Sequence, residues 1–323
     1  MSKPTVVVSR RWPEEVEARL EELFDVQLNE PDVPMTTAQM QDALRRADAF
    51  CPTVSDRVNA DVLGIADKKS RIVASYGVGF NHIDLDAAKA AGLTVTNTPE
   101  VLTDCTADLA MTLMLSVARR AGEGERHLRN GEWTGWRPTH MIATSVTGKS
   151  LGLIGMGRIA RAVAERAARG FGMKVFFHDP FPPSAEQLEG LNATQCESPE
   201  QVYAAADFVS LHCPGGDSTY HLISDAAFSA MNPHAFLINT ARGDVVDEAA
   251  LVRALQNGEI AGAGLDVFES EPAVSPALLE MENVVLLPHL GSATRETRVA
   301  MGMRVVENLE GFFAGREPRD KLV

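Results

Sequence analysis

The sequence predicts an α/β fold of two parallel-sheet domains, and three observations lead to that fold class. A chain of 323 residues is long enough for roughly two domains, each with its own core. Apolar runs of strand length alternate with amphipathic helical stretches in both halves. A glycine-rich turn near residue 155 joins one such strand to a helix. Alternation of this kind is typical of parallel sheets covered by helices on both faces.

The first half of the chain contains the elements of one such domain. The stretch 13–24 has its apolar residues on one face of a helix. Thr36 and Gln39 have the spacing of a capping box in front of a second helix. The other elements expected here are strands at 5–8, 71–75 and 93–96.

The second half opens with a helix at 103–118 that is apolar on most sides, which indicates that it is buried. Ser198 and Gln201 have capping-box spacing before a further helix, and Asp247 and Gly258 are expected to cap and end another. The remaining expected elements are strands at 151–154, 174–177, 208–212, 235–239, 261–267 and 284–287 and helices at 198–206 and 247–257.

The last expected helix, 292–314, lies beyond the final strand of the second domain. No later segment could complete another strand–helix unit, so we expect the chain to cross back to the first domain. The predicted domains are therefore 1–98 together with 291–323, which would bind the substrate, and 99–290, which would bind the cofactor.

The glycine-rich turn, GMGRIA at 155–160, has the pattern of a dinucleotide-binding turn. Gly155 would permit the tight turn, Gly157 would let the backbone approach the pyrophosphate, and Ala160 would let the helix lie close to the strand. The helix N-terminus would offer unpaired N–H groups to the phosphates. Such a glycine pattern alone also occurs in ordinary loops, but here the flanking strands, the helix and a following acid are all present.

That acid is Asp179, which follows the next strand at the register the motif requires. Its carboxylate would accept hydrogen bonds from both hydroxyls of the adenine ribose and would repel a 2′-phosphate. The sequence therefore predicts NAD rather than NADP. An Asp-Pro pair is also an ordinary turn starter, which is the structural alternative for this residue.

The composition and net charge disfavour some classes of binding partner. A net charge of −14 and an isoelectric point near 5.0 disfavour nucleic acid and anionic membranes, since both would be repelled. No segment resembles a membrane span or a signal peptide. The four cysteines, Cys51, Cys105, Cys196 and Cys213, lack zinc-ligand spacing. We expect a cytoplasmic protein with reduced thiols and no metal site.

A nicotinamide enzyme that acts on a carbonyl needs an acid/base, usually histidine, and a cation for an anionic substrate. Arg242, Glu271 and His289 each follow a predicted strand. Because the ends of parallel strands converge on one crevice, we expect the three side chains to meet there. Each of these residues also has a structural alternative. Arg242 could be a surface turn residue, Glu271 before Pro272 could simply end a strand, and His289 could have a structural role.

Several stretches together form a longer pattern. They are SYGVGFNHID (75–84), NTPEVLTDCTADLA (97–110), the glycine-rich turn, LHCP (211–214), FLINTARGDVVDEAAL (236–251), GAGLDVFESEP (262–272) and LPHLGSAT (287–294). This pattern resembles the D-isomer-specific 2-hydroxyacid dehydrogenase family over nearly the whole chain. EWTGWRPTHM (132–141) is most similar to its glyoxylate/hydroxypyruvate reductase branch.

The resemblance implies two Rossmann-like domains, one flavodoxin-like and one NAD-binding, with an active-site cleft between them. Arg242 would bind the substrate carboxylate and carbonyl, aided by the backbone N–H groups of Val78 and Gly79. His289 would donate a proton during reduction, and Glu271 would hold His289 protonated. The implied cofactor contacts are Thr106, Gly155, Gly157, Arg158, Ile159, Asp179, Pro214, Thr240 and Asp266, the last of them to the nicotinamide carboxamide.

The resemblance also implies a homodimer in which Trp133 and Trp136 lie near the active-site mouth or reach the partner subunit; core packing is their alternative. Ala160 stands where many relatives have glycine, a change that the turn tolerates. HDPF at 178–181 differs from the basic or small polar residues of NADP-preferring reductases, so NAD remains the expected cofactor.

The expected reaction is reduction of glyoxylate or hydroxypyruvate, with phenylpyruvate, 2-ketogluconate and 3-phosphoglycerate as alternatives within the family. Formate dehydrogenases carry Gln where Glu271 stands, which disfavours that activity. The competing class is an NAD-sensing scaffold, similar to corepressors that share the fold. The lack of a basic tail or a long disordered extension disfavours it.

Overall fold

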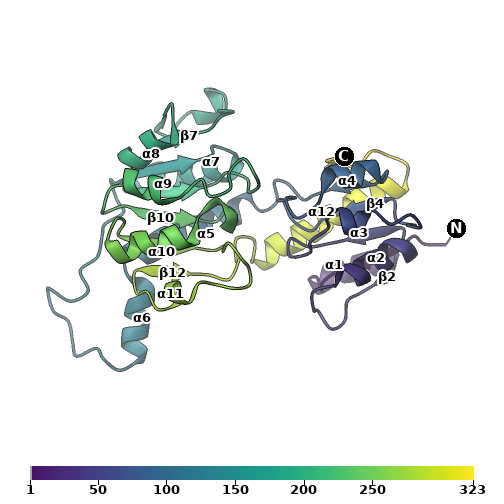
Figure 1. Cartoon of the computed structure of the whole chain (residues 1–323), viewed down its shortest axis with the longest axis horizontal. Helices are drawn as coiled ribbons and strands as arrows, with labels where there is room; N and C mark the ends of the chain where they lie inside the picture. Colours follow the sequence, from purple (N-terminus) through teal and green to yellow (C-terminus); the bar gives the residue numbers. More distant parts are fainter. Residues whose placement is uncertain (1) are drawn as a thin grey trace. The chain divides into compact units, whose positions relative to one another are not determined.

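The computed structural model of the chain describes residues 2–323, which form two compact units. Unit 1 consists of the residues up to Leu102 together with Ala293–Val323, and unit 2 is Thr103–Ser292. Each unit has its own parallel sheet with helices on both faces (Figure 1). The predicted α/β class with two parallel-sheet units is confirmed. None of the helices described is long and apolar enough to cross a bilayer.

Unit 1 is built on a five-stranded sheet of order β2-β1-β3-β4-β5. Its strands are β1 Thr5–Val8, β2 Asp25–Gln27, β3 Ala49–Cys51, β4 Ile72–Ala74 and β5 Thr94–Thr96, and its helices are α1 Glu14–Leu23, α2 Thr37–Arg46, α3 Ala60–Leu63, α4 Leu85–Ala90 and α12 Arg295–Phe313. Helices α1 and α12 cover one face of the sheet, and α2, α3 and α4 cover the other. The capping box of Thr36 and Gln39 is present at the start of α2.

Helix α12 packs within unit 1. It begins after Thr294, whose hydroxyl accepts the Thr297 N–H at 3.3 Å. Its apolar face packs Val305 and Leu309 into the core shared with β1 and α1. Beyond α12 the chain lies along β5, where the Leu322 N–H donates to the Val95 carbonyl at 2.8 Å. The final residues therefore belong to the structure of unit 1.

Unit 2 is built on a seven-stranded parallel sheet of order β12-β11-β10-β9-β6-β7-β8. Its strands are β6 Ser150–Ile154, β7 Lys174–His178, β8 Ala193–Gln195, β9 Phe208–Leu211, β10 Phe236–Asn239, β11 Gly262–Leu265 and β12 Val284–Leu286. Its helices are α5 Thr103–Ala118, α6 Ala121–Arg129, α7 Arg158–Glu165, α8 Pro199–Ala205, α9 Asp225–Ala230, α10 Glu248–Asn257 and α11 Pro276–Leu279. Strand order reverses between β6 and β9, and ligands of such sheets bind at this switch point.

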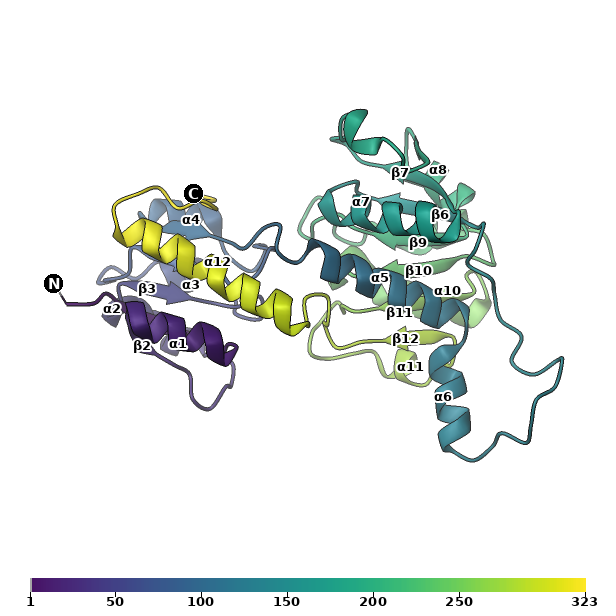
Figure 2. The same cartoon turned by 180° about the vertical axis from the view of Figure 1, so that it is seen from behind.

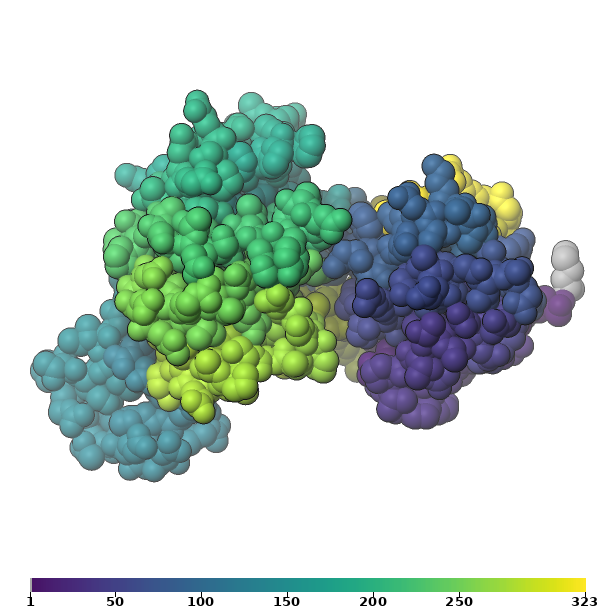
Figure 3. All heavy atoms as spheres, viewed as in Figure 1, coloured from purple at the N-terminus to yellow at the C-terminus, as the bar shows by residue number. Residues whose placement is uncertain are grey.

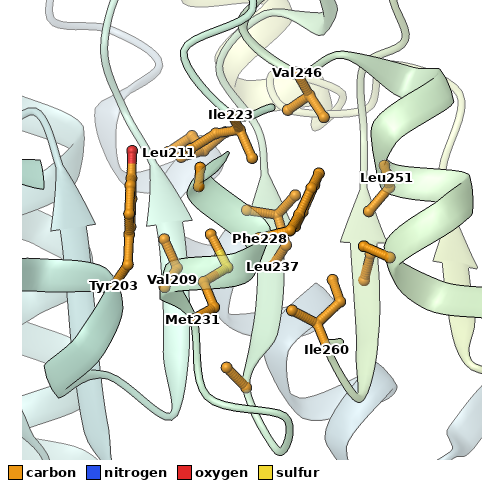
Figure 4. Packing of buried hydrophobic residues seen from close by; sticks show 14 of the residues in the cluster. Tyr203, Val209, Leu211, Ile223, Phe228, Met231, Leu237, Val246, Leu251 and Ile260 are labelled. Atoms are coloured by element: carbon orange, nitrogen blue, oxygen red, sulfur yellow. The ribbon is translucent and has the colours of Figure 1, made fainter. Parts of the chain in front are cut away.

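Two buried clusters stabilise unit 2, one on each face of its sheet. Helices α5 and α7 pack on one face (Figure 2). Helices α8, α9 and α10 pack on the other, where Phe228, Leu237 and Leu251 are fully buried (Figure 4). Each such side chain contributes roughly 1.5–3 kcal/mol through burial. These clusters hold the strand ends that carry the candidate site.

The capping residues predicted from the sequence are confirmed for α2 and α10, and the prediction for α8 is wrong. Asp247 accepts the Ala250 N–H, and Gly258 ends α10 in the left-handed conformation, as predicted. The capping box predicted for Ser198 and Gln201 is absent, because the Gln201 side chain accepts the Glu197 N–H at 3.0 Å instead. The short strands β2, β3 and β8 were not predicted, since three residues are too few to show a period.

Candidate active site

The glycine turn lies at the switch point of the unit 2 sheet. Gly155 has a φ of +87°, and a Cβ there would come within 2.9 Å of backbone atoms of His212 and Cys213, just after β9. Only glycine fits so tight a turn. Gly157 forms the N-cap of α7, and a Cβ on it would meet nothing within 4 Å. The helix N-terminus is therefore open to a phosphate group.

Asp179 lies directly beside this turn. Its Oδ2 accepts the Met156 N–H at 2.7 Å, and its Oδ1 accepts the Phe181 N–H at 2.8 Å. Both bonds orient the carboxylate at the end of β7, and each oxygen has a lone pair left. The two ribose-type hydroxyls of a nucleotide on the glycine turn would find an acceptor here. Phe181 itself is exposed.

His289 and Glu271 are brought together by the ends of β12 and β11. His289 Nδ1 lies 2.9 Å from Glu271 Oε2, and the two side chains are about one-third exposed. Glu271 Oε1 accepts the Phe268 N–H at 3.1 Å, which orients the carboxylate. His289 has a left-handed backbone, with a φ of +55°. The imidazole Nε2 makes no hydrogen bond within residues 2–323, so it remains available to a substrate.

Electrostatics hold the Glu271 carboxylate in its charged form. Burial alone would raise the pKa of Glu271, but the hydrogen bond and charge of His289, the Phe268 N–H and the charge of Arg242 together lower it below the usual value. Burial lowers the pKa of Arg242, and the charges of Glu271 and Asp244 oppose that shift. The three predicted side chains therefore share one electrostatic environment in unit 2.

Asn239 at the end of β10 holds the turn that presents Arg242. Its side chain accepts the Ala241 N–H at 3.0 Å and donates to the Arg242 carbonyl at 2.9 Å. The residue is 1% exposed. The sequence does not reveal this role, because an Asn at a strand end is equally typical of a plain turn.

Asp266 and Thr106 hold the loop that carries His289. The Asp266 carboxylate accepts the N–H groups of Leu290 at 2.6 Å and Gly291 at 2.8 Å. Burial raises its pKa, and the Leu290 N–H and the charge of His289 oppose that shift. Thr106 of α5 donates to the Gly291 carbonyl at 2.9 Å. The sequence predicts both residues as cofactor contacts, and the structure shows that they hold the loop that follows His289.

One buried polar atom at the end of β10 has no partner. The Thr240 hydroxyl is buried and makes no hydrogen bond within the described chain. Such a group costs free energy unless a ligand satisfies it. Thr240 was predicted as a cofactor contact, and this unpaired hydroxyl fits a polar group of a bound nicotinamide nucleotide. Together with the open helix N-terminus and Asp179, unit 2 has the donors and acceptors that the cofactor requires.

Asp244 fixes the loop after β9 that includes Pro214. Its Oδ2 accepts the Gly216 N–H at 3.0 Å, and a Cβ on Gly215 would lie 2.9 Å from the Arg242 Cβ. The glycine therefore lets this loop approach Arg242 closely. Cys213 precedes it, and burial raises the pKa of its thiol to about 11, so the thiol stays protonated at neutral pH. Neither Asp244 nor Gly215 has a local sequence signal that indicates these contacts.

Val78 and Gly79 lie in unit 1, on the loop after β4. A Cβ on neighbouring Gly77 would lie 2.5 Å from a methyl group of Val54, so this loop also requires glycine. The N–H groups of Val78 and Gly79 donate to no acceptor in residues 2–323. Two adjacent donors without acceptors are suited to an anion.

Comparison with known proteins identifies the family. A family model described as D-isomer specific 2-hydroxyacid dehydrogenase, NAD binding domain, matches residues 111–291. The chain belongs to this family. It is an NAD(P)-dependent oxidoreductase with the two-domain α/β fold of the D-2-hydroxyacid dehydrogenases.

Curated relatives match over almost the whole chain. A glyoxylate reductase from Thermococcus litoralis is 42% identical over 98% of this chain and 96% of its own length. A glyoxylate reductase from Korarchaeum cryptofilum is 43% identical over 98% of this chain and 95% of its own length. Among solved structures, the NADPH-dependent glyoxylate/hydroxypyruvate reductase of Sinorhizobium meliloti, in complex with NADP and malonate, has a TM-score of 0.88 and 38% identity over 100% of this chain and 97% of that one.

Trp133 and Trp136 of this dehydrogenase lie in the segment between α6 and β6. Their exposed fractions are 53% and 82%, which excludes the alternative that they pack in a core. Helix α6 itself has no buried residue. The segment stands out from the sheet of unit 2 as a separate lobe, seen at the lower left of the space-filling view (Figure 3).

Proposed function

We propose that this dehydrogenase reduces a small 2-oxo acid, glyoxylate or hydroxypyruvate, to the D-2-hydroxy acid with NADH. The observation that carries the proposal is the His289–Glu271 pair at 2.9 Å, with Nε2 of the imidazole left for a substrate and the charge of Arg242 acting on the same carboxylate. This is the acid, orienting base and cation that carbonyl reduction of an anion needs.

The residues divide the chemistry between them. The Arg242 guanidinium binds the carboxylate and polarises the carbonyl, and the Val78 and Gly79 N–H groups bind the carboxylate as well. The bound nicotinamide supplies a hydride to the carbonyl carbon. His289 Nε2 gives its proton to the carbonyl oxygen, and Glu271 stabilises the imidazolium before that transfer. Oxidation of the hydroxy acid returns the proton to His289.

We propose the same positions for the cofactor as the sequence predicts. Gly155, Gly157, Arg158 and Ile159 would hold the pyrophosphate, and Thr106, Pro214, Thr240 and Asp266 would line the nicotinamide side. Asp179 would bind the adenine ribose and favour NADH, since a 2′-phosphate would be repelled by the carboxylate. The fixed position of this carboxylate beside the glycine turn supports that preference.

We also propose that the protein acts as a cytoplasmic homodimer. The exposed apolar side chains around α6 support an interface there, among them Leu128, Trp136 and Ile142. A second copy would cover them and bring the tryptophans towards a substrate pocket that admits only small side chains. Light scattering of the wild type and of Trp136→Ala tests this, with a shift towards monomer expected for the variant.

The decisive experiment follows the absorbance of the reduced nicotinamide. Purified protein is mixed with NADH or NADPH and with glyoxylate, hydroxypyruvate, pyruvate, 2-ketogluconate or phenylpyruvate. Fast NADH oxidation with the smallest acids is the expected result. Preference for NADPH contradicts the role of Asp179 and leaves the three catalytic side chains intact. Absence of turnover with every acid and both cofactors favours the NAD-sensing scaffold.

A further inference from the structure

The loop that carries Val78 and Gly79 is held from behind by two hydrogen bonds. The Gly77 carbonyl accepts the Thr98 N–H at 2.9 Å. The Val78 carbonyl accepts the side-chain amide of Asn97 at 2.8 Å. Neither bond involves the N–H groups that the proposed function assigns to the substrate, yet both determine where those groups point.

The reason is the geometry of the peptide group. In a planar trans peptide the C=O and the following N–H point in opposite directions. Among the described residues only Glu271–Pro272 is a cis peptide, so both peptides of this loop are trans. The bond to the Gly77 carbonyl thus orients the Val78 N–H, and the bond to the Val78 carbonyl orients the Gly79 N–H. Both donors point away from the segment 97–98.

Asn97 is itself anchored by residues far along the sequence. Its carbonyl accepts the side-chain amide of Asn308, in α12, at 3.3 Å. Its N–H donates to the Asp320 carbonyl at 3.4 Å. Asp320 and Asn308 are joined by two further bonds, of 3.1 and 3.2 Å, and Arg304 lies 3.5 Å from the Asp320 carboxylate. Asn97 is 6% exposed and Asn308 is fully buried.

The network fixes the backbone of Asn97, because its carbonyl and its N–H are paired with Asn308 and Asp320. From this fixed backbone the buried side-chain amide donates to the Val78 carbonyl, and turning the side chain away would leave that carbonyl without its donor. The network reaches from α12 and the segment after it to a loop whose outward N–H groups have no partner within residues 2–323. A network that only stabilised the fold would not need to leave the N–H groups of Val78 and Gly79 without an acceptor among residues 2–323.

We propose that Asn97 is a positioning residue for substrate binding, which aims the Gly79 N–H at the carboxylate of the 2-oxo acid, and that Asp320 and Asn308 hold Asn97 in place. This role rests on the proposed function. It makes the segment after α12 part of the substrate-binding apparatus although none of its residues contacts the substrate. The carboxylate is common to all 2-oxo acids, so the role is independent of the substrate side chain.

Asn97→Asp tests the role with almost no change of shape. A carboxylate cannot donate to the Val78 carbonyl, so the Gly79 peptide loses its orientation. We expect KM for glyoxylate and for hydroxypyruvate to rise by the same factor, about tenfold or more, while the Kd of NADH stays unchanged because the proposed cofactor residues lie in unit 2. Asp320→Asn is the second variant, which removes the charge facing Arg304, and a smaller rise in both KM values is expected.

Asn59→Ala is the matched control. Asn59 caps α3 in the same unit through the Val62 N–H, and its side chain has no hydrogen bond to the loop within residues 2–323. This variant should lower thermal stability without changing either KM. If the wild type is active and both Asn97→Asp and Asp320→Asn keep its KM values, the positioning role is overturned and the proposed function stands. A wild type that reduces neither acid overturns the proposed function and this role together.

Discussion

Among the histidine–glutamate pairs of unit 2, two are alike in distance, side-chain exposure and backbone conformation. His289 lies 2.9 Å from Glu271, and His221 lies 2.9 Å from Glu269. The side chains of both pairs are about one-third exposed. Both histidines have a left-handed backbone, with φ angles of +55° and +51°. Distance, burial and backbone strain therefore do not distinguish an acid/base from a structural pair.

The pairs differ in which atoms remain available. His289 uses Nδ1 for its glutamate and keeps Nε2, whereas His221 uses Nε2 and stacks its ring on Tyr220 at 3.9 Å. Glu269 is locked to α10, because its carboxylate accepts the Glu248 N–H and its own N–H donates to the Glu248 carboxylate. The charge of Arg242 contributes to the lowered pKa of Glu271. We propose that a free Nε2, together with the nearby cation Arg242, makes the His289 pair the catalytic one.

The largest expected effect comes from His289→Gln. The amide keeps a polar group but cannot transfer a proton, so kcat should fall by about a thousandfold. Steady-state turnover of glyoxylate measures it, and NADH fluorescence titration should show unchanged cofactor binding. Turnover near that of the wild type would assign the proton to another group.

Arg242→Lys should be next in size. Lysine keeps the charge but loses the two-pronged contact with a carboxylate, so kcat/KM should fall by about a hundredfold, mainly through KM. The same kinetic series measures the change. Arg253→Lys is the control, because Arg253 forms an exposed ion pair with Asp225 elsewhere in unit 2. An equal loss in both variants would count against a substrate role for Arg242.

Glu271→Gln should change the pH dependence. The pKa of Glu271 is below its usual value, so the carboxylate is charged at neutral and mildly acidic pH and stabilises the imidazolium throughout that range. The amide keeps the shape but removes the charge, so kcat for reduction at pH 7 should fall by about tenfold. In the wild type the charge is lost only when pH falls through the lowered pKa of Glu271, so an acid limb due to this carboxylate should be missing from the profile of the variant. An unchanged kcat at pH 7 argues that the carboxylate only orients the ring.

The smallest effect is expected from His221→Gln, which sharpens the comparison between the pairs. Loss of the bond to Glu269 should lower the free energy of unfolding by about 1 kcal/mol, as for a partly exposed hydrogen-bonded pair. Turnover should stay within about twofold of the wild type. Urea unfolding and steady-state kinetics measure the two quantities. A loss comparable with that of His289→Gln would remove the distinction drawn between the two pairs.

The features that could be predicted from the sequence are those with local signals. The glycine turn at 155–160, the caps of α2 and α10 and the fold class follow from residues close together in the chain. So does the grouping of Arg242, Glu271 and His289 in unit 2, because parallel strands place their carboxyl ends on one edge. These inferences need only spacing and the rule for parallel sheets.

The contacts that distinguish neighbouring candidate residues could be seen only in the folded chain. It showed that Asn239 and Asp266 support the active loops, that His289 rather than His221 keeps Nε2, and that Asn97 joins the loop of Val78 to Asp320. It also showed that Ser198 makes no cap bond. These outcomes depend on side chains meeting across long sequence separations, where a hydrogen bond is decided by competing partners and by burial rather than by spacing along the chain.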